Sequence, residues 1–369
     1  MKKIFSVLVF ILYLLLLFAI GIAAVEMLAR HLRPNLLHSP REREKFCRYD
    51  PEIGWVHKPS VAGVFESRDF KVDIQINSKG LRDSGEPAYE KSPGKFRVAV
   101  FGDSFTWGFG VEAHETFAER LESALPQTEA LNFGCSGYGQ DQELLLLKRE
   151  GVKYQPDLVI AMVHMASDFD NNSAFFQYGF YKPFFKYENA ALHLENVPVP
   201  KETAGIAVNN WLLDRFVSWR ILGNRRMGAV DLASAAVAVA DGKTSLIGSA
   251  NRNLPSAQLT CFLCAEIKKQ TDAIQGQTLF VLSPNLILPQ SGQKNKIMPE
   301  DSRYAALRQC LQEKGMEILD LRPIFETQLI REPEVKLTFD HDAHWNAKGH
   351  EVVAKAIQQA IQEKTAPKA

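Results

Sequence analysis

The sequence lacks several features that would point to common classes of function. Lys plus Arg and Asp plus Glu number 43 each, so no excess charge of either sign attracts a nucleic acid. There is no Gly-Lys-Ser/Thr phosphate loop and no GxGxxG motif after a predicted strand, which argues against a nucleotide. The five cysteines are odd in number, which argues against a disulfide scaffold. The composition fits one large α/β domain, or one domain with an insertion, behind an apolar start.

One cysteine pair, Cys261 and Cys264, has the CxxC spacing of some zinc and redox sites. The pair stands in a pattern typical of a helix, and no second pair of ligands accompanies it. Ordinary helix residues, with or without a disulfide, are therefore favoured over a zinc site or a redox pair. The sequence predicts no metal and no cofactor.

The first 30 residues predict a membrane anchor. An uncharged apolar run extends from Ile4 to Val25, which is about the length needed to cross a bilayer core. The small residues Gly21 and Ala23 leave a cleaved signal peptide as the alternative, but the run is longer than the usual signal. Basic residues stand on both sides of the run, so the positive-inside rule leaves its orientation open.

A candidate nucleophile follows a short apolar run near residue 100. Arg97–Phe101 is apolar, rich in Val and followed by turn residues, which predicts a buried strand of a parallel sheet. Ser104 stands just past the carboxyl end of this strand, where open α/β sheets bind their ligands. Taken alone, Ser104 is better explained as a helix cap, because Ser and Asp are favoured caps.

A candidate base and its orienting carboxylate stand near the other end of the chain. Asp342 and His344 are two residues apart on a predicted loop, before a helical pattern. An extended backbone places both side chains on one side, so Asp342 can accept from Nδ1 of His344. A serine hydroxyl becomes a good nucleophile only when an oriented base removes its proton. We therefore predict a triad of Ser104 as nucleophile, His344 as base and Asp342 as orienting group.

Three blocks of the sequence resemble the SGNH (GDSL-type) serine hydrolases. They are Phe101–Gly108, Asn132–Gly139 and Asp342–His350, and the resemblance spans roughly Tyr49–Lys364 with a poorly matched middle. The best resemblance is to a bacterial membrane-tethered subgroup that includes polysaccharide O-acetyl esterases and acetyltransferases. It implies an oxyanion hole built from the backbone amides of Ser104 and Gly137, although the glycines of the second block would also suit an ordinary turn.

The third block departs from the family pattern. The family usually has Asn-Asp there, and its Asn donates to the oxyanion, whereas this chain has Ser167-Asp168. A Ser hydroxyl can donate, but it is shorter and has one hydrogen to place. We therefore keep Ser167 as a third oxyanion donor, and we expect Asp103 and Asp168 to support the site.

Strand and helix patterns alternate from Phe96 onward, which predicts a parallel sheet with crossover helices. The layout is that of a flavodoxin-like three-layer sandwich with about five strands in the order 2-1-3-4-5. We expect an anchor at 1–30, an accessory β-containing segment at 31–95 and a hydrolase-like domain at 96–364. An insertion at about 175–253, aromatic at first and Ala-rich later, is expected over the active-site face, where its aromatic residues could stack on sugars or pack a lid.

Together these features predict a serine-dependent ester hydrolase that forms an acyl-enzyme. The resemblance implies acyl or acetyl esters of an envelope glycan as substrates, envelope polysaccharide machinery as a partner and an extracytoplasmic catalytic domain. One alternative is an acyltransferase that uses the same triad with a sugar hydroxyl as acceptor. A second is a non-catalytic binding module, which the missing Asn favours. A third is a metal site among Asp340, His341, Asp342, His344 and His350.

Overall fold

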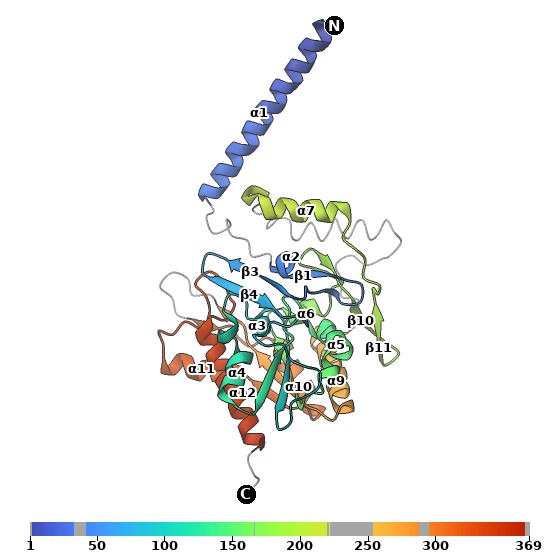
Figure 1. The fold of residues 1–369 in the computed structure, drawn as a ribbon, viewed down its shortest axis with the longest axis vertical. Coiled ribbons are helices and arrows are strands. Elements are labelled where there is room, and N and C mark those ends of the chain that lie inside the picture. The colour runs from blue at the N-terminus through green and yellow to red at the C-terminus, as the bar shows by residue number, and fades with distance from the viewer. Residues whose placement is uncertain are drawn as a thin grey trace. The chain divides into compact units, whose positions relative to one another are not determined.

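The computed structural model describes residues 2–32, 42–165, 167–219, 221, 254–287 and 295–365 (Figure 1). The chain divides into two compact units. Met1–Ser39 and Glu202–Ile247 make up one unit, and Pro40–Lys201 and Gly248–Ala369 make up the other. The residues of the predicted triad and oxyanion hole all belong to the second unit.

A parallel five-stranded sheet forms the centre of the larger unit. Its order along the sheet is β6-β5-β7-β12-β15, which is 2-1-3-4-5 when the strands are counted along the chain, so the predicted flavodoxin-like layout is confirmed. All seven residues of the central strand β7 are buried, as expected for a strand covered on both faces. The strands are β5 (Phe96–Phe101), β6 (Thr128–Asn132), β7 (Leu158–His164), β12 (Gln277–Ser283) and β15 (Ile318–Asp320).

Helices cover both faces of this sheet and complete the three layers (Figure 1). Alternate residues of β5 point to opposite faces: Ala99 and Phe101 belong to one apolar core, and Val98 and Val100 to the other. The first core is covered by α5 (Gln140–Arg149), α9 (Ser256–Ala273) and α10 (Ser302–Glu313), and the second by α4 (Phe117–Ala124), α11 (Arg322–Arg331) and α12 (Ala347–Thr365).

A disulfide joins two helices that cover the same face of the sheet. Cys261 of α9 bonds Cys310 of α10, and Cys264 is free and buried. The CxxC spacing therefore marks neither a zinc site nor a redox pair. The prediction of helix residues with a disulfide is confirmed, although the partner of Cys261 lies 49 residues away.

The accessory segment forms two antiparallel hairpins after the short helix α2 (Glu42–Phe46). In β4 the buried residues alternate with exposed ones, as in a strand with one face on the core and one on solvent. Phe65 and Phe70 of the second hairpin pack against Trp107 and Phe109, which follow Ser104. The hairpins are β1 (Cys47–Asp50) with β2 (Gly54–His57), and β3 (Val61–Glu66) with β4 (Lys71–Ile76).

Short elements fill the connections of the larger unit. The predicted insertion begins with two more hairpins, while residues 220 and 222–253, including its Ala-rich part, lie outside the described residues. The remaining elements are α3 (Ser104–Trp107), η2 (Ala113–Glu115), η3 (Gly151–Tyr154), α6 (Asp168–Asn171), β8 (Phe176–Gln177), β9 (Phe180–Tyr181), β10 (Phe184–Glu188), β11 (Ala191–Glu195), β13 (Leu286–Ile287) and β14 (Lys296–Ile297).

The smaller unit contains the apolar helix α1 (Lys2–Leu32) and α7 (Ala204–Arg215). Ile4–Leu32 is long and apolar enough to cross a membrane, which is consistent with the predicted anchor and also with a signal sequence. Near the end of α1, the carboxylate of Glu26 accepts hydrogen bonds from the backbone N–H groups of Val217 and Ser218 at 2.9 and 3.0 Å. The end of α1 is thus tied to the chain that follows α7.

Candidate active site

The three side chains of the predicted triad form one line of hydrogen bonds. Ser104 Oγ lies 2.7 Å from His344 Nε2, and His344 Nδ1 lies 2.5 Å from Asp342 Oδ1. Burial opposes the charge of Asp342, but the side-chain hydrogen bond from His344, the charge of His344 and the hydrogen bond from its backbone N–H together outweigh burial and lower the pKa of Asp342. Because an ionised carboxylate only accepts, Nδ1 carries the ring hydrogen, and Nε2 can take the hydroxyl proton of Ser104.

Ser104 is positioned by the end of β5 and the start of α3. Asp103 caps this short helix, and its Oδ1 accepts from the backbone N–H of Phe105 at 2.9 Å. Gly102 makes the tight turn possible, since a Cβ at this position would lie 2.1 Å from Thr106 Oγ1. The hydroxyl therefore stands at the carboxyl edge of the sheet, as predicted.

The imidazole of His344 is held by aromatic rings as well as by Asp342. It lies between Phe105 and Phe109, whose ring centroids are 4.7 and 4.0 Å from its own. The loop that carries His344 is also tied to the accessory segment. Asp69, in the β3–β4 turn, accepts from the backbone N–H of His341 at 2.8 Å and lies 2.7 Å from its Nδ1.

The loop after β6 carries Gly137, whose backbone amide is the second predicted oxyanion donor. The backbone N–H of Cys135 donates to the carbonyl oxygen of Gly102 at 3.0 Å, so this loop runs beside the turn that carries Ser104. Gly137 has φ +82°, in the left-handed region that favours glycine. Among the described residues, neither the amide of Ser104 nor that of Gly137 has a hydrogen-bond acceptor. Both amides are therefore free to serve an oxyanion.

Ser167, Asp103 and Asp168 lie together behind the nucleophile. Ser167 Oγ is 3.2 Å from Asp103 Oδ2 and 3.1 Å from Asp168 Oδ1. Burial raises the pKa of Asp103 to about 6, against the pull of its hydrogen bond from Phe105. Burial, together with the charge of Asp103, raises the pKa of Asp168 well above its usual range. Asp168 also accepts from Gln140 Nε2 at 2.7 Å and from the backbone N–H of His164 at 2.8 Å.

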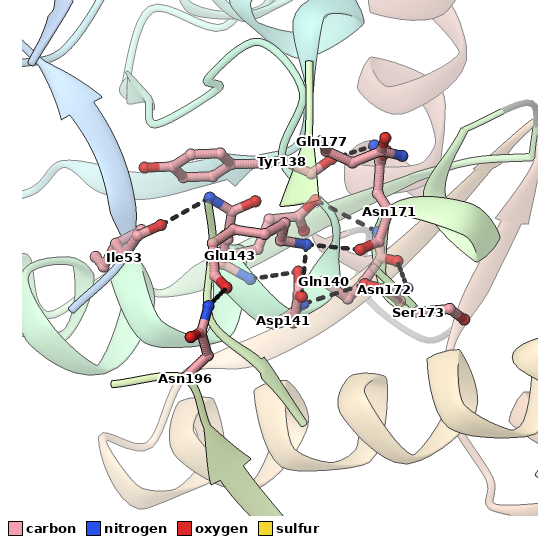
Figure 2. A network of polar contacts seen from close by, with 12 residues as sticks. Ile53, Tyr138, Gln140, Asp141, Glu143, Asn171, Asn172, Ser173, Gln177 and Asn196 are labelled. Atoms are coloured by element: carbon pink, nitrogen blue, oxygen red, sulfur yellow. Dashed lines mark hydrogen bonds and ion pairs between the residues drawn. The ribbon is translucent and has the colours of Figure 1, made fainter. Parts of the chain in front are cut away.

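A buried polar network supports the second block from behind (Figure 2). Asn171 donates through Nδ2 to the carbonyl oxygen of Tyr138 at 3.2 Å, and Asn172 donates to Gln140 Oε1 at 2.8 Å. Lys182 Nζ is 2.6 Å from Asp141 Oδ2, and both side chains are fully buried. These contacts fix the loop that carries Gly137 against the start of α5 and the segment around α6.

The acidic and histidine residues around the triad do not form a metal cluster. Asp340 pairs with Lys336 at 2.6 Å, and His341 pairs with Asp69. His350 is buried, and its Nδ1 accepts from the backbone N–H of Phe117 at 3.2 Å. The predicted alternative of a metal site in this stretch therefore has no support in the structure.

The structure also places two residues at the site that the sequence did not indicate. A Cβ on Gly137 would lie 2.8 Å from the ring of Tyr178 and 3.0 Å from Nη1 of Arg43. The guanidinium of Arg43 lies 4.3 Å from the centroid of the Tyr178 ring. Arg43 comes from the accessory segment and Tyr178 from the β8–β9 turn, so only the fold brings them to Gly137.

Comparison with known families agrees with this picture for part of the chain. Residues 275–369 match the family model described as "SGNH hydrolase-like domain, acetyltransferase AlgX". Of the three predicted blocks, Asp342–His350 lies in this range, and the match supports the resemblance there and an esterase or an acyltransferase. No curated protein matches the chain.

Several solved structures are similar in part. The acetyl xylan esterase AlAXEase is 15% identical to this chain, with a TM-score of 0.40. The match covers 72% of this chain and 99% of the esterase chain. The hydrolase LAE5 from the metagenome of Lake Arreo is 15% identical, with a TM-score of 0.39, and the match covers 74% of this chain and 97% of LAE5. A putative lipolytic protein of the G-D-S-L family from Desulfitobacterium hafniense DCB-2 is 11% identical, with a TM-score of 0.35. The match covers 72% of this chain and 99% of the lipolytic protein. Likenesses this distant say nothing of the activity of this chain.

Proposed function

We propose that this protein is a serine-dependent esterase or acyltransferase whose acyl-enzyme forms on Ser104. The observation that carries the proposal is the unbroken line of hydrogen bonds from Ser104 Oγ through His344 to Asp342. A packed core does not need such a line, and two of its members stand 240 residues apart in the chain. Serine nucleophiles need a base and an orienting acid in this relation.

In the proposed reaction, Ser104 Oγ attacks the carbonyl carbon of an ester while its proton passes to His344 Nε2. Asp342 stabilises the imidazolium and keeps its Nδ1 hydrogen directed away from the substrate. The amides of Ser104 and Gly137 hold the negative oxygen of the tetrahedral intermediate. The alcohol then leaves with the proton from His344, and the acyl group remains on Ser104. Water or a sugar hydroxyl next attacks this ester, with His344 again as base, and Ser104 is restored.

Ser167 is proposed to make a smaller contribution to the oxyanion hole. Its hydroxyl lies within donating distance of two carboxyl groups, those of Asp103 and Asp168. Ser167 has only one hydrogen to donate, and we propose that it goes to Asp103, whose pKa burial raises less than that of Asp168. The hydroxyl can reach out to an oxyanion only by giving up the bond to Asp103. The two carboxyls thereby support the site and limit what Ser167 adds.

The proposed substrates are acyl or acetyl esters of an envelope glycan, processed outside the cytoplasm. The family model that matches residues 275–369 names an acetyltransferase, which supports acetyl transfer as well as hydrolysis. The Cys261–Cys310 disulfide supports an oxidising compartment. The apolar helix Ile4–Leu32 supports attachment to a membrane, with envelope polysaccharide machinery as the proposed partner.

A fluorophosphonate probe tests the nucleophile directly. Such a probe labels an activated serine, so the full-length protein in detergent should be labelled stoichiometrically, while Ser104→Ala should not be labelled. Ser136→Ala is the matched control, because its buried hydroxyl stands next to Gly137 without a hydrogen-bond partner among the described residues. Labelling that persists in Ser104→Ala, or is absent from the wild-type protein, would contradict the proposal.

Acceptor dependence separates the two reactions that the triad allows. An esterase releases acetate from an acetylated donor at a rate that an added glycan leaves unchanged. A transferase moves the acetyl group to the glycan, so acetate release falls as acetylated glycan appears. Mass spectrometry of the glycan, with His344→Ala as the inactive control, distinguishes these outcomes.

A further inference from the structure

Three buried side chains with metal-binding atoms converge away from the triad. The sulfur atoms of Cys47 and Cys135 and a ring nitrogen of His57 all lie within 4.8 Å of one another. The exposed fractions of these residues are 8%, 2% and 9%, respectively. In the part of the chain that the structure describes, no other group of His, Cys, Asp or Glu has this arrangement. Both cysteines are outside the disulfide.

His57 is already oriented as a metal ligand would be. Its Nδ1 lies 3.0 Å from the carbonyl oxygen of Gly80. A carbonyl only accepts, so Nδ1 carries the hydrogen and Nε2 presents its lone pair. A hydrogen bond from the distal ring nitrogen to a backbone carbonyl is the usual support of a metal-bound histidine. The ring is thus held in one tautomer with Nε2 as the remaining ligand atom.

We propose that Cys47, His57 and Cys135 bind one Zn²⁺ ion. Two thiolates and an imidazole are ligands that favour zinc among the common divalent ions. Zinc binds sulfur at about 2.3 Å and nitrogen at about 2.0 Å in a tetrahedron, which needs ligand atoms somewhat closer together than 4.8 Å. A small contraction of the three side chains satisfies this geometry.

The surroundings leave room for an entry path and for water as a fourth ligand. His57 and Cys135 line a cavity of about 470 Å³ that also contacts Tyr138 and Arg149. A metal held by three protein ligands keeps one position for water, and an ion needs a route to a buried site. The cavity can provide both.

The metal would tie the accessory segment to the second block. Cys47 and His57 belong to β1 and β2, and Cys135 precedes Gly137 by two residues. Trp55 of β2 also donates through Nε1 to the carbonyl oxygen of Ser136 at 3.1 Å. Zinc at this point would therefore stabilise the loop that presents the Gly137 amide. The effect of zinc on activity through this loop rests on the proposed function, whereas the proposal that the site binds zinc does not.

Cobalt titration tests the site on the full-length protein in detergent, purified with reductant and stripped of metal. One Co²⁺ per chain should bind, with a thiolate-to-cobalt charge-transfer band and the visible bands of tetrahedral cobalt, and Zn²⁺ should displace it. Cys47→Ser and Cys135→Ser should each weaken binding by roughly tenfold or more. Cys264→Ala is the matched control, since it removes the third free, buried cysteine and should leave binding unchanged.

Two results on the wild-type protein would overturn the proposal whether or not the variants fold. One is the absence of the charge-transfer band at stoichiometric cobalt. The other is a Cys47–Cys135 disulfide in peptides mapped from protein isolated without reductant, because the thiols would then be consumed. Ser104→Ala should bind cobalt like the wild type, so failure of the proposed catalysis would not be mistaken for failure of the metal site.

Discussion

The rate cost of having Ser167 where related enzymes have Asn can be worked out from the structure. An oxyanion donor contributes about 2.7–4 kcal/mol to catalysis. To donate to an oxyanion, Ser167 must release Asp103, whose Oδ2 lies 3.2 Å from its hydroxyl. A hydrogen bond to a charged group stabilises by about 1.5–3 kcal/mol. The net gain from Ser167 is then about 1 kcal/mol, which corresponds to a factor of roughly five in rate.

Two substitutions test this estimate in opposite directions. Ser167→Ala should lower kcat roughly fivefold, because only the net contribution is lost. Ser167→Asn introduces an amide with two hydrogens, so one can remain on Asp103 while the other reaches the oxyanion. This variant should exceed the wild-type kcat by on the order of tenfold. The assay is steady-state hydrolysis of p-nitrophenyl acetate, and KM should change little because the contact forms only in the transition state.

Either of two outcomes would refute the reasoning. A hundredfold or larger loss of kcat in Ser167→Ala, with an unchanged melting temperature, would show that the hydroxyl is a full oxyanion donor. A kcat for Ser167→Asn at or below that of the wild type would show that competition with Asp103 does not limit the rate. Ser136→Ala again serves as the control for a serine removed nearby.

Three further outcomes are expected. Asp342→Asn should lower kcat on the order of 10⁴-fold without loss of fold, because the imidazole loses its oriented tautomer; near-normal hydrolysis of p-nitrophenyl acetate would contradict the triad. Burial lowers the pKa of His350 from 6.5 to about 3. Between pH 6.5 and about 3 the imidazole is therefore protonated in the unfolded chain but neutral in the folded one, so the free energy of unfolding falls as the pH drops through this range. His350→Gln should flatten the dependence of melting temperature on pH below about 6.5, and equal slopes in both proteins would exclude this account. Replacing Cys261 and Cys310 together by Ser should cost about 2–4 kcal/mol in urea unfolding, since their bridge closes a 49-residue separation; an unchanged midpoint would show that the bridge is dispensable.

The sheet could be predicted because each of its strands is a short apolar run that ends in turn residues. The strand before Ser104 was expected at 97–101 and is found at Phe96–Phe101. The last strand of the sheet is short, at Ile318–Asp320. Local patterns fix such elements, and the alternation of strands with helices then predicts a parallel sheet, whose order 2-1-3-4-5 is the one usual for a flavodoxin-like layout.

Local spacing was a poor guide wherever side chains meet from distant segments. The CxxC spacing drew attention to Cys264, but Cys261 bonds Cys310. Cys47, His57 and Cys135 carry no recognisable spacing, because they come from two strands and a later loop. The same holds for Arg43 and Tyr178, which meet only where the accessory segment and the β8–β9 turn reach Gly137. Such sites depend on tertiary packing, which no short pattern in one sequence encodes.

The accessory segment contacts both loops on which the proposed catalysis depends. Its β2 strand holds the second block from one side, since Trp55 donates to the carbonyl of Ser136 and Tyr138 donates back to the carbonyl of Trp55. Its β3–β4 turn holds the loop of the base through Asp69. An oxyanion hole and a base are useful only when both are fixed relative to the nucleophile. Sequence treats residues 31–95 as a neighbour of the hydrolase domain, whereas the contacts show that this segment fixes the loops on which Ser104 depends.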